Sequence, residues 1–177
     1  MKSLTKTFIK TLSALFIIAI SVAMIGCKGS KKEETAEISG MIKVDLTSYG
    51  LPVTINLPDS TKGKLEIEAA ADGTIKIKVR KAFQISLYED PGDITLKKSD
   101  IAGDEVKKLQ KYVIDEPTTI LYETLITEPE FHFYTIVKAG DKSYVVEDIV
   151  GEIFSEEAAK TMLESAKSIV LKEKAES

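Results

Sequence analysis

The sequence is poor in the residues from which catalytic and metal sites are often built. Its 177 residues include one cysteine, Cys27, one histidine, His132, and no tryptophan. A single cysteine cannot close an intramolecular disulfide, which excludes a small disulfide-stapled domain. These two residues cannot form a zinc site without carboxylate ligands. The hydrophobic content of 44% and the charged content of 29% exclude disordered, collagen-like and coiled-coil chains.

Positive charge is scarce outside the N-terminus. Three of the 24 lysines and arginines, Lys2, Lys6 and Lys10, lie in residues 1–26, which contain no acidic residue. The other 21 basic residues stand against 28 acidic ones, a net charge of −7 for the rest of the chain. An acidic folded part argues against a nucleic-acid partner.

The N-terminus has the organisation of a lipoprotein signal peptide. The three lysines form a positively charged n-region, and the apolar run from Leu12 to Ile25 has the length of an h-region. At 14 residues, this run is shorter than the roughly 20 residues that a membrane-spanning helix needs. It leads into Met24-Ile25-Gly26-Cys27, which resembles the lipobox of bacterial lipoproteins.

The lipobox resemblance implies cleavage between Gly26 and Cys27, diacylation of the Cys27 sulfur and acylation of the new amino group. Two or three acyl chains such as palmitate anchor a protein stably, since each buried methylene contributes about 0.8 kcal/mol. We therefore expect residues 1–26 to be a signal peptide and Cys27 to bind membrane lipid through its acyl chains. An ordinary thiol buried in a membrane helix is the alternative for Cys27.

Residues 27–37 are polar, with no apolar side chain between Cys27 and Ala36. Such a segment buries too little surface to order itself, so we expect a flexible tether. Lys31-Lys32-Glu33-Glu34 partly resembles the acid-rich export signals of Bacteroidota surface lipoproteins. A charged linker in the periplasm explains these residues equally well. The sequence thus predicts a lipid-anchored protein of the bacterial cell envelope, in the outer membrane. Whether it faces the periplasm or the cell surface stays open.

From residue 38 onward, apolar and polar residues alternate as in half-buried strands. We expect the first five strands around residues 42–46, 51–57, 65–69, 75–79 and 83–87. Ala71-Asp72-Gly73 fits a three-residue hairpin loop with the glycine in the left-handed conformation. That loop pairs Leu65 with Val79. It also sets Glu66 against Lys78, whereas a two-residue Asp-Gly turn would pair apolar with charged side chains.

Two helices and three more strands are expected after a turn at residues 90–93. The first helix is indicated by an N-cap at Ser99 or Asp100, by Val106, Leu109 and Val113 at helical spacing, and by a stop at Asp115-Glu116-Pro117. The strands follow at about 118–126, 131–138 and 143–150. The last helix begins after Ser155 as N-cap. Its apolar stripe comprises Ala159, Met162, Leu163, Ala166, Ile169 and Val170.

This order predicts a single α+β domain over residues 38–177, with a mostly antiparallel sheet of about six to seven strands packed against two main helices. The order of the elements resembles that of the PsbP-like fold over residues 40–171. Three segments add to this resemblance: Gly50-Leu51-Pro52, Leu57-Pro58-Asp59 and, near the end, Ala166-Lys167-Ser168-Ile169. That fold occurs in the extrinsic photosystem II subunit and in DcrB-type lipoproteins. The resemblance implies an accessory or binding subunit without a shared catalytic site.

His132 is the only imidazole base that the chain offers for nucleophilic catalysis. It lies in Phe131-His132-Phe133-Tyr134, where alternation places it on the face opposite the two phenylalanines. We expect it to pair with neighbours in the sheet, and a catalytic or metal-binding role is the alternative. An acylated Cys27 could not be its nucleophilic partner.

Carboxylates cluster at Glu89-Asp90-Asp93, Asp115-Glu116 and Glu147-Asp148. The first cluster lies in a Pro-Gly turn and could bind calcium, but it lacks the ligand spacing of an EF-hand loop, so we expect a solvated turn. Glu147 and Asp148 are successive residues of a strand. They should point to opposite faces, which prevents their acting as a paired acid and base.

Two further motifs have both a functional and an ordinary interpretation. Asp59-Ser60-Thr61 resembles the Asp-Ser/Thr-X acceptor of Bacteroidota O-glycosylation, which makes Ser60 a candidate site, but a simple turn explains it as well. Lys76, Lys78 and Arg80 form a basic row suited to lipid headgroups or an acidic partner. Glutamates opposite two of these residues should neutralise the row, so we expect an ordinary exposed face.

No catalytic constellation, metal site or cofactor motif emerges, so we predict that the protein is not an enzyme and uses no cofactor. The leading hypothesis is a membrane-anchored lipoprotein whose domain binds an envelope protein as an accessory subunit. The alternative is a small-ligand-binding lipoprotein with a pocket between the sheet and the helices, lined by Phe131, Phe133, Tyr134 and Tyr144. Those aromatic residues also suit the core of a sheet.

Overall fold

The computed structural model describes residues 40–59 and 61–172. The predicted signal peptide, Cys27, the tether and Ser60 lie outside these residues. The described part contains ten strands, two α-helices and a short 3-10 helix, η1 (Thr47–Tyr49). Neither α-helix of this part is long and apolar enough to cross a membrane.

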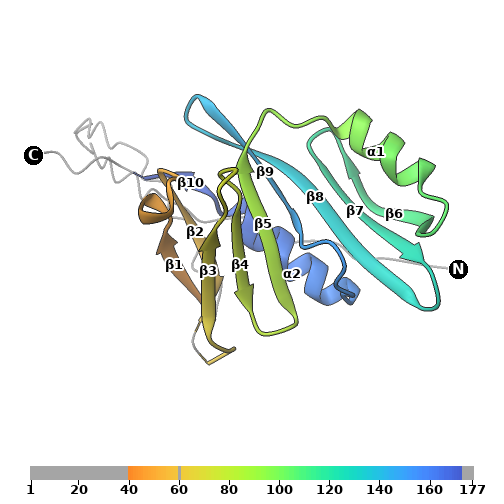
Figure 1. The fold of residues 1–177 in the computed structure, drawn as a ribbon, viewed down its shortest axis with the longest axis horizontal. Coiled ribbons are helices and arrows are strands. Elements are labelled where there is room, and N and C mark those ends of the chain that lie inside the picture. The colour runs from red at the N-terminus through yellow and green to blue at the C-terminus, as the bar shows by residue number, and fades with distance from the viewer. Residues whose placement is uncertain (1–39, 60, 173–177) are drawn as a thin grey trace, which may run out of the picture. The chain divides into compact units, whose positions relative to one another are not determined.

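The strands form two antiparallel sheets (Figure 1). The smaller sheet has the order β1-β2-β10, with β1 (Met41–Asp45), β2 (Val53–Pro58) and β10 (Val170–Leu171). The larger sheet has the order β3-β4-β5-β9-β8-β7-β6. Its strands are β3 (Leu65–Ala69), β4 (Ile75–Val79), β5 (Phe83–Glu89), β6 (Lys108–Glu116), β7 (Thr119–Leu125), β8 (Pro129–Ala139) and β9 (Lys142–Asp148).

The α+β class, the antiparallel pairing and a sheet of seven strands agree with the sequence analysis, but the expectation that a single sheet holds all the strands was wrong. The larger sheet has seven strands, and three more strands form a second sheet. The separation occurs at β2, which pairs with β1 on one edge and with β10 on the other. Because both edges of β2 are occupied, β3 cannot pair with β2, and it forms one edge of the larger sheet.

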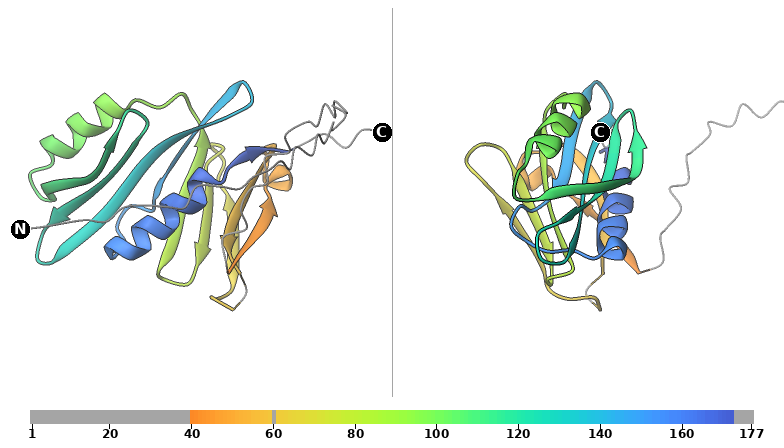
Figure 2. Two further views of the ribbon diagram at one scale, coloured as in Figure 1. Left: turned by 180° about the vertical axis from the view of Figure 1, so that it is seen from behind. Right: turned by 90° about the vertical axis from the view of Figure 1, so that its right-hand side faces the viewer.

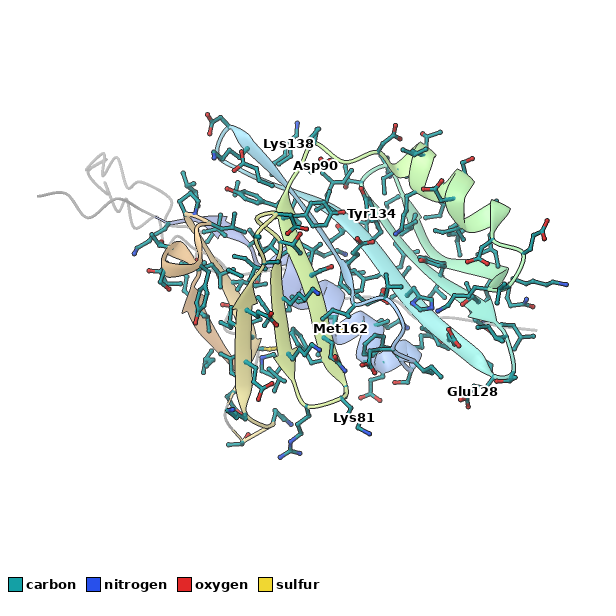
Figure 3. The ribbon with its side chains drawn as sticks, in the orientation of Figure 1. Lys81, Asp90, Glu128, Tyr134, Lys138 and Met162 are labelled. Atoms are coloured by element: carbon teal, nitrogen blue, oxygen red, sulfur yellow. The ribbon has the colours of Figure 1, made fainter. Side chains whose placement is uncertain are left out.

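The main hydrophobic core lies between the smaller sheet, helix α2 (Glu156–Lys167) and one face of the larger sheet. Its fully buried members include Ile55 of β2, Ile77 of β4, Ile85 of β5 and Leu163 of α2. Helix α2 crosses the back of the larger sheet (Figure 2). Met162 of α2 lies behind β5 (Figure 3), and its sulfur accepts the Gln84 N–H at 3.2 Å.

A second, smaller core lies on the opposite face of the larger sheet, under helix α1 (Ile94–Gly103). It contains Ile101 of the helix and, from the strands, Ile120, Tyr122, Tyr134 and Val145. Their sequence neighbours, such as Leu121 and Phe133, belong to the main core, as strand alternation requires. The two α-helices therefore cover opposite faces of the larger sheet (Figure 2).

The first helix was predicted at the wrong place. Helix α1 begins after Asp93, whose Oδ1 accepts the Thr95 and Leu96 N–H groups at 2.8 and 2.9 Å, and it ends at Gly103. Ser99 and Asp100 are therefore inside the helix rather than at its cap. Residues 108–116, which contain Leu109 and Val113, are strand β6.

Two irregularities in the pairing of β6 with β7 explain this error. The register shifts between Leu109 and Lys111 and again between Tyr112 and Ile114. Each bulge adds a residue to the strand, so apolar side chains no longer alternate strictly and their spacing imitates that of a helix. The turn at Pro117 ends this strand instead of a helix.

The start of α2 was predicted correctly, but its end was not. Ser155 is the N-cap, and its hydroxyl accepts the Ala158 N–H at 3.2 Å. The helix ends at Lys167, because the Ser168 hydroxyl accepts the Asn56 N–H of β2 at 2.8 Å. The chain then leaves the helix, and Val170 pairs with β2 in strand β10 instead of extending the apolar stripe.

The β3–β4 hairpin has the predicted register. Leu65 pairs with Val79, and Glu66 pairs with Lys78. Gly73 has a φ of 86°, and the Ala70 N–H donates to the Thr74 carbonyl at 2.8 Å, which leaves the expected three-residue loop. In the same register Glu68 stands opposite Lys76, so glutamates face two members of the basic row, as the sequence predicted.

Candidate functional site

A cavity of about 240 Å³ lies between α1 and the end of the larger sheet. Helix α1 contributes Lys97, Asp100 and Ile101 to its wall, and β7, β8 and β9 contribute Tyr122, Thr124, His132, Glu147 and Asp148. Asp104, Lys107 and Val150 from the adjoining loops complete the lining. Most of the lining residues are polar, and the cavity has the sheet as its floor and the helix as its roof.

Asp148 is placed at the point where β8 and β9 stop pairing. The last pair of this ladder is Tyr134 with Glu147. One residue further, the Phe133 N–H donates at 2.8 Å to the Asp148 carboxylate rather than to a backbone carbonyl. The second carboxylate oxygen accepts His132 Nδ1–H at 2.7 Å. One side chain thus satisfies two buried donors and orients the imidazole.

The other nitrogen of His132 makes no hydrogen bond to any residue in the described part of the chain. His132 is 6% exposed, and its Nε2 is buried without a partner. The nearest charged atom is Glu130 Oε2 at 3.5 Å, and that oxygen accepts a hydrogen bond from Lys107 Nζ at 2.9 Å. The imidazole is therefore fixed at Nδ1 and free at Nε2. This confirms the expectation that it pairs with neighbours in the sheet.

Two residues of β7 lie beside the imidazole. Thr124 is 2% exposed, and its Oγ1 also has no hydrogen-bond partner within residues 40–59 and 61–172. Tyr122 pairs with His132 in the ladder, with ring centroids 5.5 Å apart. Burial raises the pKa of the Tyr122 phenol, and the Asp148 and Glu147 carboxylates raise it further. Tyr122 therefore stays a neutral phenol in the wall of the cavity.

Glu147 connects the sheet to the roof of the cavity. Its carboxylate accepts hydrogen bonds from Lys97 Nζ of α1 at 2.6 Å and from the Tyr88 hydroxyl at 3.2 Å. Burial, followed by the charge of Glu147, raises the pKa of Tyr88. The expectation that Glu147 and Asp148 face opposite sides was wrong, because Asp148 turns at the strand end and both residues line the cavity. Each has its own partners.

The aromatic residues proposed as a ligand pocket do not form one. Phe133 and Tyr144 are buried in the main core, and Phe131 packs against it. Tyr134 belongs to the core on the opposite face (Figure 3). These four side chains stabilise two different cores, while the cavity under α1 uses other residues.

The carboxylates of the turn before α1 have separate structural roles. Asp93 caps α1, Asp90 accepts the Gly92 N–H at 2.7 Å, and Glu89 pairs with Lys142 at 2.7 Å. Asp115 pairs with Lys98 of α1. Among residues 40–59 and 61–172, no group of three His, Cys, Asp or Glu side chains is placed to hold a metal ion.

Asp59 and Thr61, the two residues that flank the candidate glycosylation residue Ser60, are joined by hydrogen bonds. The Asp59 carboxylate accepts the Thr61 N–H at 2.9 Å and the Thr61 hydroxyl, and these hydrogen bonds lower the pKa of Asp59. The turn interpretation therefore has direct support at the two residues that flank Ser60.

Sequence reasoning singled out His132 but missed Thr124, Glu130 and Lys107. Their signal is weak and consists of polar residues at strand positions where an apolar residue is expected. Glu130 and His132 are two residues apart on one strand face, and Thr124 pairs with Glu130 in the β7–β8 ladder. Comparison of the chain with protein-family models, with curated proteins and with solved structures finds no match.

Proposed function

We propose that the chain is a lipid-anchored lipoprotein of the bacterial cell envelope and that its folded domain is a non-catalytic binding module. The lipobox at Met24-Ile25-Gly26-Cys27 supports the anchor. The PsbP-like resemblance supports an accessory role in place of catalysis. In the cavity, the Thr124 hydroxyl makes no hydrogen bond to His132, so the fixed imidazole has no activated nucleophile beside it.

The observation that carries protein binding is a group of exposed apolar side chains at the cavity mouth. Val150 lines the cavity and is 84% exposed. Val106, at 68%, precedes the lining residue Lys107. Exposed apolar residues around a polar centre are typical of protein interfaces.

Photo-crosslinking in cells tests the protein-binding role. A photoreactive residue at Val150 or Val106 is expected to give a discrete crosslinked product. The same residue at Ile42, which is 42% exposed on β1, serves as the control and should give none. Equal products from all three positions, or none from Val150 and Val106, would exclude this end of the sheet as the partner surface.

Intact mass tests the lipid anchor independently. The wild-type protein should lose residues 1–26 and gain the mass of its acyl chains, whereas Cys27→Ala should remain unprocessed. An unprocessed wild-type mass would overturn the lipoprotein assignment. Protease treatment of intact cells then distinguishes a surface location from a periplasmic one. A lipoprotein on the cell surface is digested, whereas a periplasmic one is protected.

Small-ligand binding is the second candidate function. It is favoured by the cavity itself, where two buried polar atoms, His132 Nε2 and Thr124 Oγ1, have no partner among the described residues. Buried polar groups are otherwise almost always hydrogen-bonded. A ligand in the cavity would satisfy both atoms.

A further inference from the structure

We propose that the cavity under α1 binds a compact aliphatic amine in its protonated form. This inference rests on the small-ligand form of the proposed function. It concerns the two unsatisfied polar atoms of the cavity wall, His132 Nε2 and Thr124 Oγ1. It does not depend on a protein partner at the cavity mouth.

The hydrogen-bonding pattern at His132 indicates a ligand that donates. Both oxygens of Asp148 accept hydrogen bonds, one from Phe133 N–H at 2.8 Å and one from His132 Nδ1 at 2.7 Å. A carboxylate that accepts from Nδ1 selects the tautomer with its proton on that nitrogen, in which Nε2 is an acceptor. The Thr124 hydroxyl can also accept.

The charges of the wall favour a cation. The cavity is lined by two lysines, and both are neutralised: Lys97 by Glu147 at 2.6 Å and Lys107 by Glu130 at 2.9 Å. Asp100 and Asp104 also line the cavity, and neither forms an ion pair with another described residue. The unpaired charge at the wall is therefore negative, which attracts an amine and repels an anion.

The size and the apolar part of the wall limit the ligand to a small one. About 240 Å³ is below the roughly 300–1,000 Å³ of sites for drug-sized molecules. Ile101 of α1 and Val150 provide apolar contacts for a short carbon chain. An ammonium group with three donors would meet Nε2 and the threonine hydroxyl at the floor of the cavity.

The single histidine makes binding directly observable. The acylated full-length protein in detergent gives one imidazole NMR signal, which comes from the cavity. Putrescine, butanediol and succinate have the same four-carbon length and differ only in end groups that are cationic, neutral or anionic. Putrescine is expected to shift the His132 signal saturably, and the diol and the diacid are expected to leave it unchanged.

Two matched variants locate the site. Thr124→Val removes the unpartnered hydroxyl in the cavity and is expected to weaken putrescine binding by about tenfold. Thr54→Val makes the same change at another buried, unpartnered hydroxyl, on β2 of the smaller sheet, and should leave the affinity unchanged. Both variants keep the side-chain shape, so both are expected to fold.

The remaining outcomes overturn the inference in distinguishable ways. Equal weakening by both threonine variants would place binding outside the cavity. A shift with butanediol or succinate but not putrescine would show that a small-ligand site exists and that its ligand class is wrong. No saturable shift with any of the three probes would exclude the small-ligand function, and the crosslinking test of a protein partner would stand unaffected.

Discussion

At the scale of single residues, Asp148 replaces a backbone group. Where β9 leaves β8, the Phe133 N–H would lose its ladder partner, and the Asp148 carboxylate accepts it instead. The next residue, Ile149, pairs toward β5 on the other side of β9, where its N–H donates to the Gln84 carbonyl at 3.1 Å. A buried donor without an acceptor is costly, so this residue allows the sheet to open at the cavity.

Replacement of Asp148 by alanine should therefore be strongly destabilising. The variant leaves the Phe133 N–H and His132 Nδ1–H buried and unpaired, and we expect the free energy of unfolding to fall by about 2–4 kcal/mol. Urea denaturation measures the change. Asp141→Ala, in the exposed β8–β9 turn, should change stability by less than about 0.5 kcal/mol. A similar loss in both variants would contradict the role assigned to Asp148.

The environment of Asp45 predicts that the stability of the fold depends on pH. Hydrogen bonds from Lys172 and Thr47 lower the pKa of its carboxyl to about 2, below the value of about 3.9 in unfolded chains. Since the folded pKa is depressed, this carboxylate stabilises the fold above pH about 4, and its contribution is lost as the pH falls toward about 2.

The measurement is thermal unfolding of wild type and Asp45→Asn from pH about 2 to about 6. The two melting temperatures should converge at the acid end, and wild type should be slightly more stable above pH about 4. The difference should be small because the ion pair is exposed. A constant difference across the range would mean that Asp45 acts through contacts that do not depend on its charge.

At the scale of elements, the two helices are held in different ways. Helix α2 buries Ala159, Met162, Leu163, Ser165 and Ala166 in the main core. Helix α1 buries only Ile101, and its other attachments are the Asp93 cap and the ion pairs of Lys97 and Lys98 with the sheet. Of the two α-helices, the roof of the cavity therefore has the smaller apolar burial to hold it against the sheet.

Removal of the α1 cap should act locally. In Asp93→Ala the helix loses an N-cap that contributes about 1 kcal/mol, and we expect faster hydrogen exchange confined to α1. Ser155→Ala removes the cap of α2 in the same way. Because α2 is part of the main core, loss of the α2 cap should accelerate hydrogen exchange across the larger sheet. Equal acceleration of α1 and β7 in Asp93→Ala would contradict the local role.

At the scale of the whole described fold, one core joins both sheets. Residues of β2, β4, β5 and α2 belong to the same buried cluster. The smaller sheet is thus not an appendage, since its inner face supplies part of the core on which the larger sheet rests. A substitution that destabilises the smaller sheet should therefore also destabilise the larger one.

The variant Ile55→Ala tests this coupling. Ile55 is fully buried on β2, and its truncation should lower the free energy of unfolding by about 2–5 kcal/mol. Five of the six tyrosines lie in the larger sheet, so tyrosine fluorescence reports on that sheet alone to a good approximation. Its urea transition should shift together with that of far-UV circular dichroism. An unchanged tyrosine transition would indicate that the sheets unfold independently.

Strands with strict alternation were predictable, and irregular ones were not. The register of β3 with β4 follows from the apolar pattern, because a one-residue slip would expose the core side chains. Strand β6 was misread because its bulges interrupt that pattern. Strand β10 was misread because its two residues follow a helix and become a strand only through contact with β2.

The sequence by itself determined the lipobox hypothesis, the hairpin register and the α2 cap, all of which depend on residues that are neighbours in the chain. It also identified His132 as the one imidazole. Only the tertiary structure placed Asp148, Thr124 and α1 around it and divided the strands between two sheets. These features depend on where β8 and β9 separate and on which strand occupies the free edge of β2. Both are decided by contacts between residues far apart in the sequence.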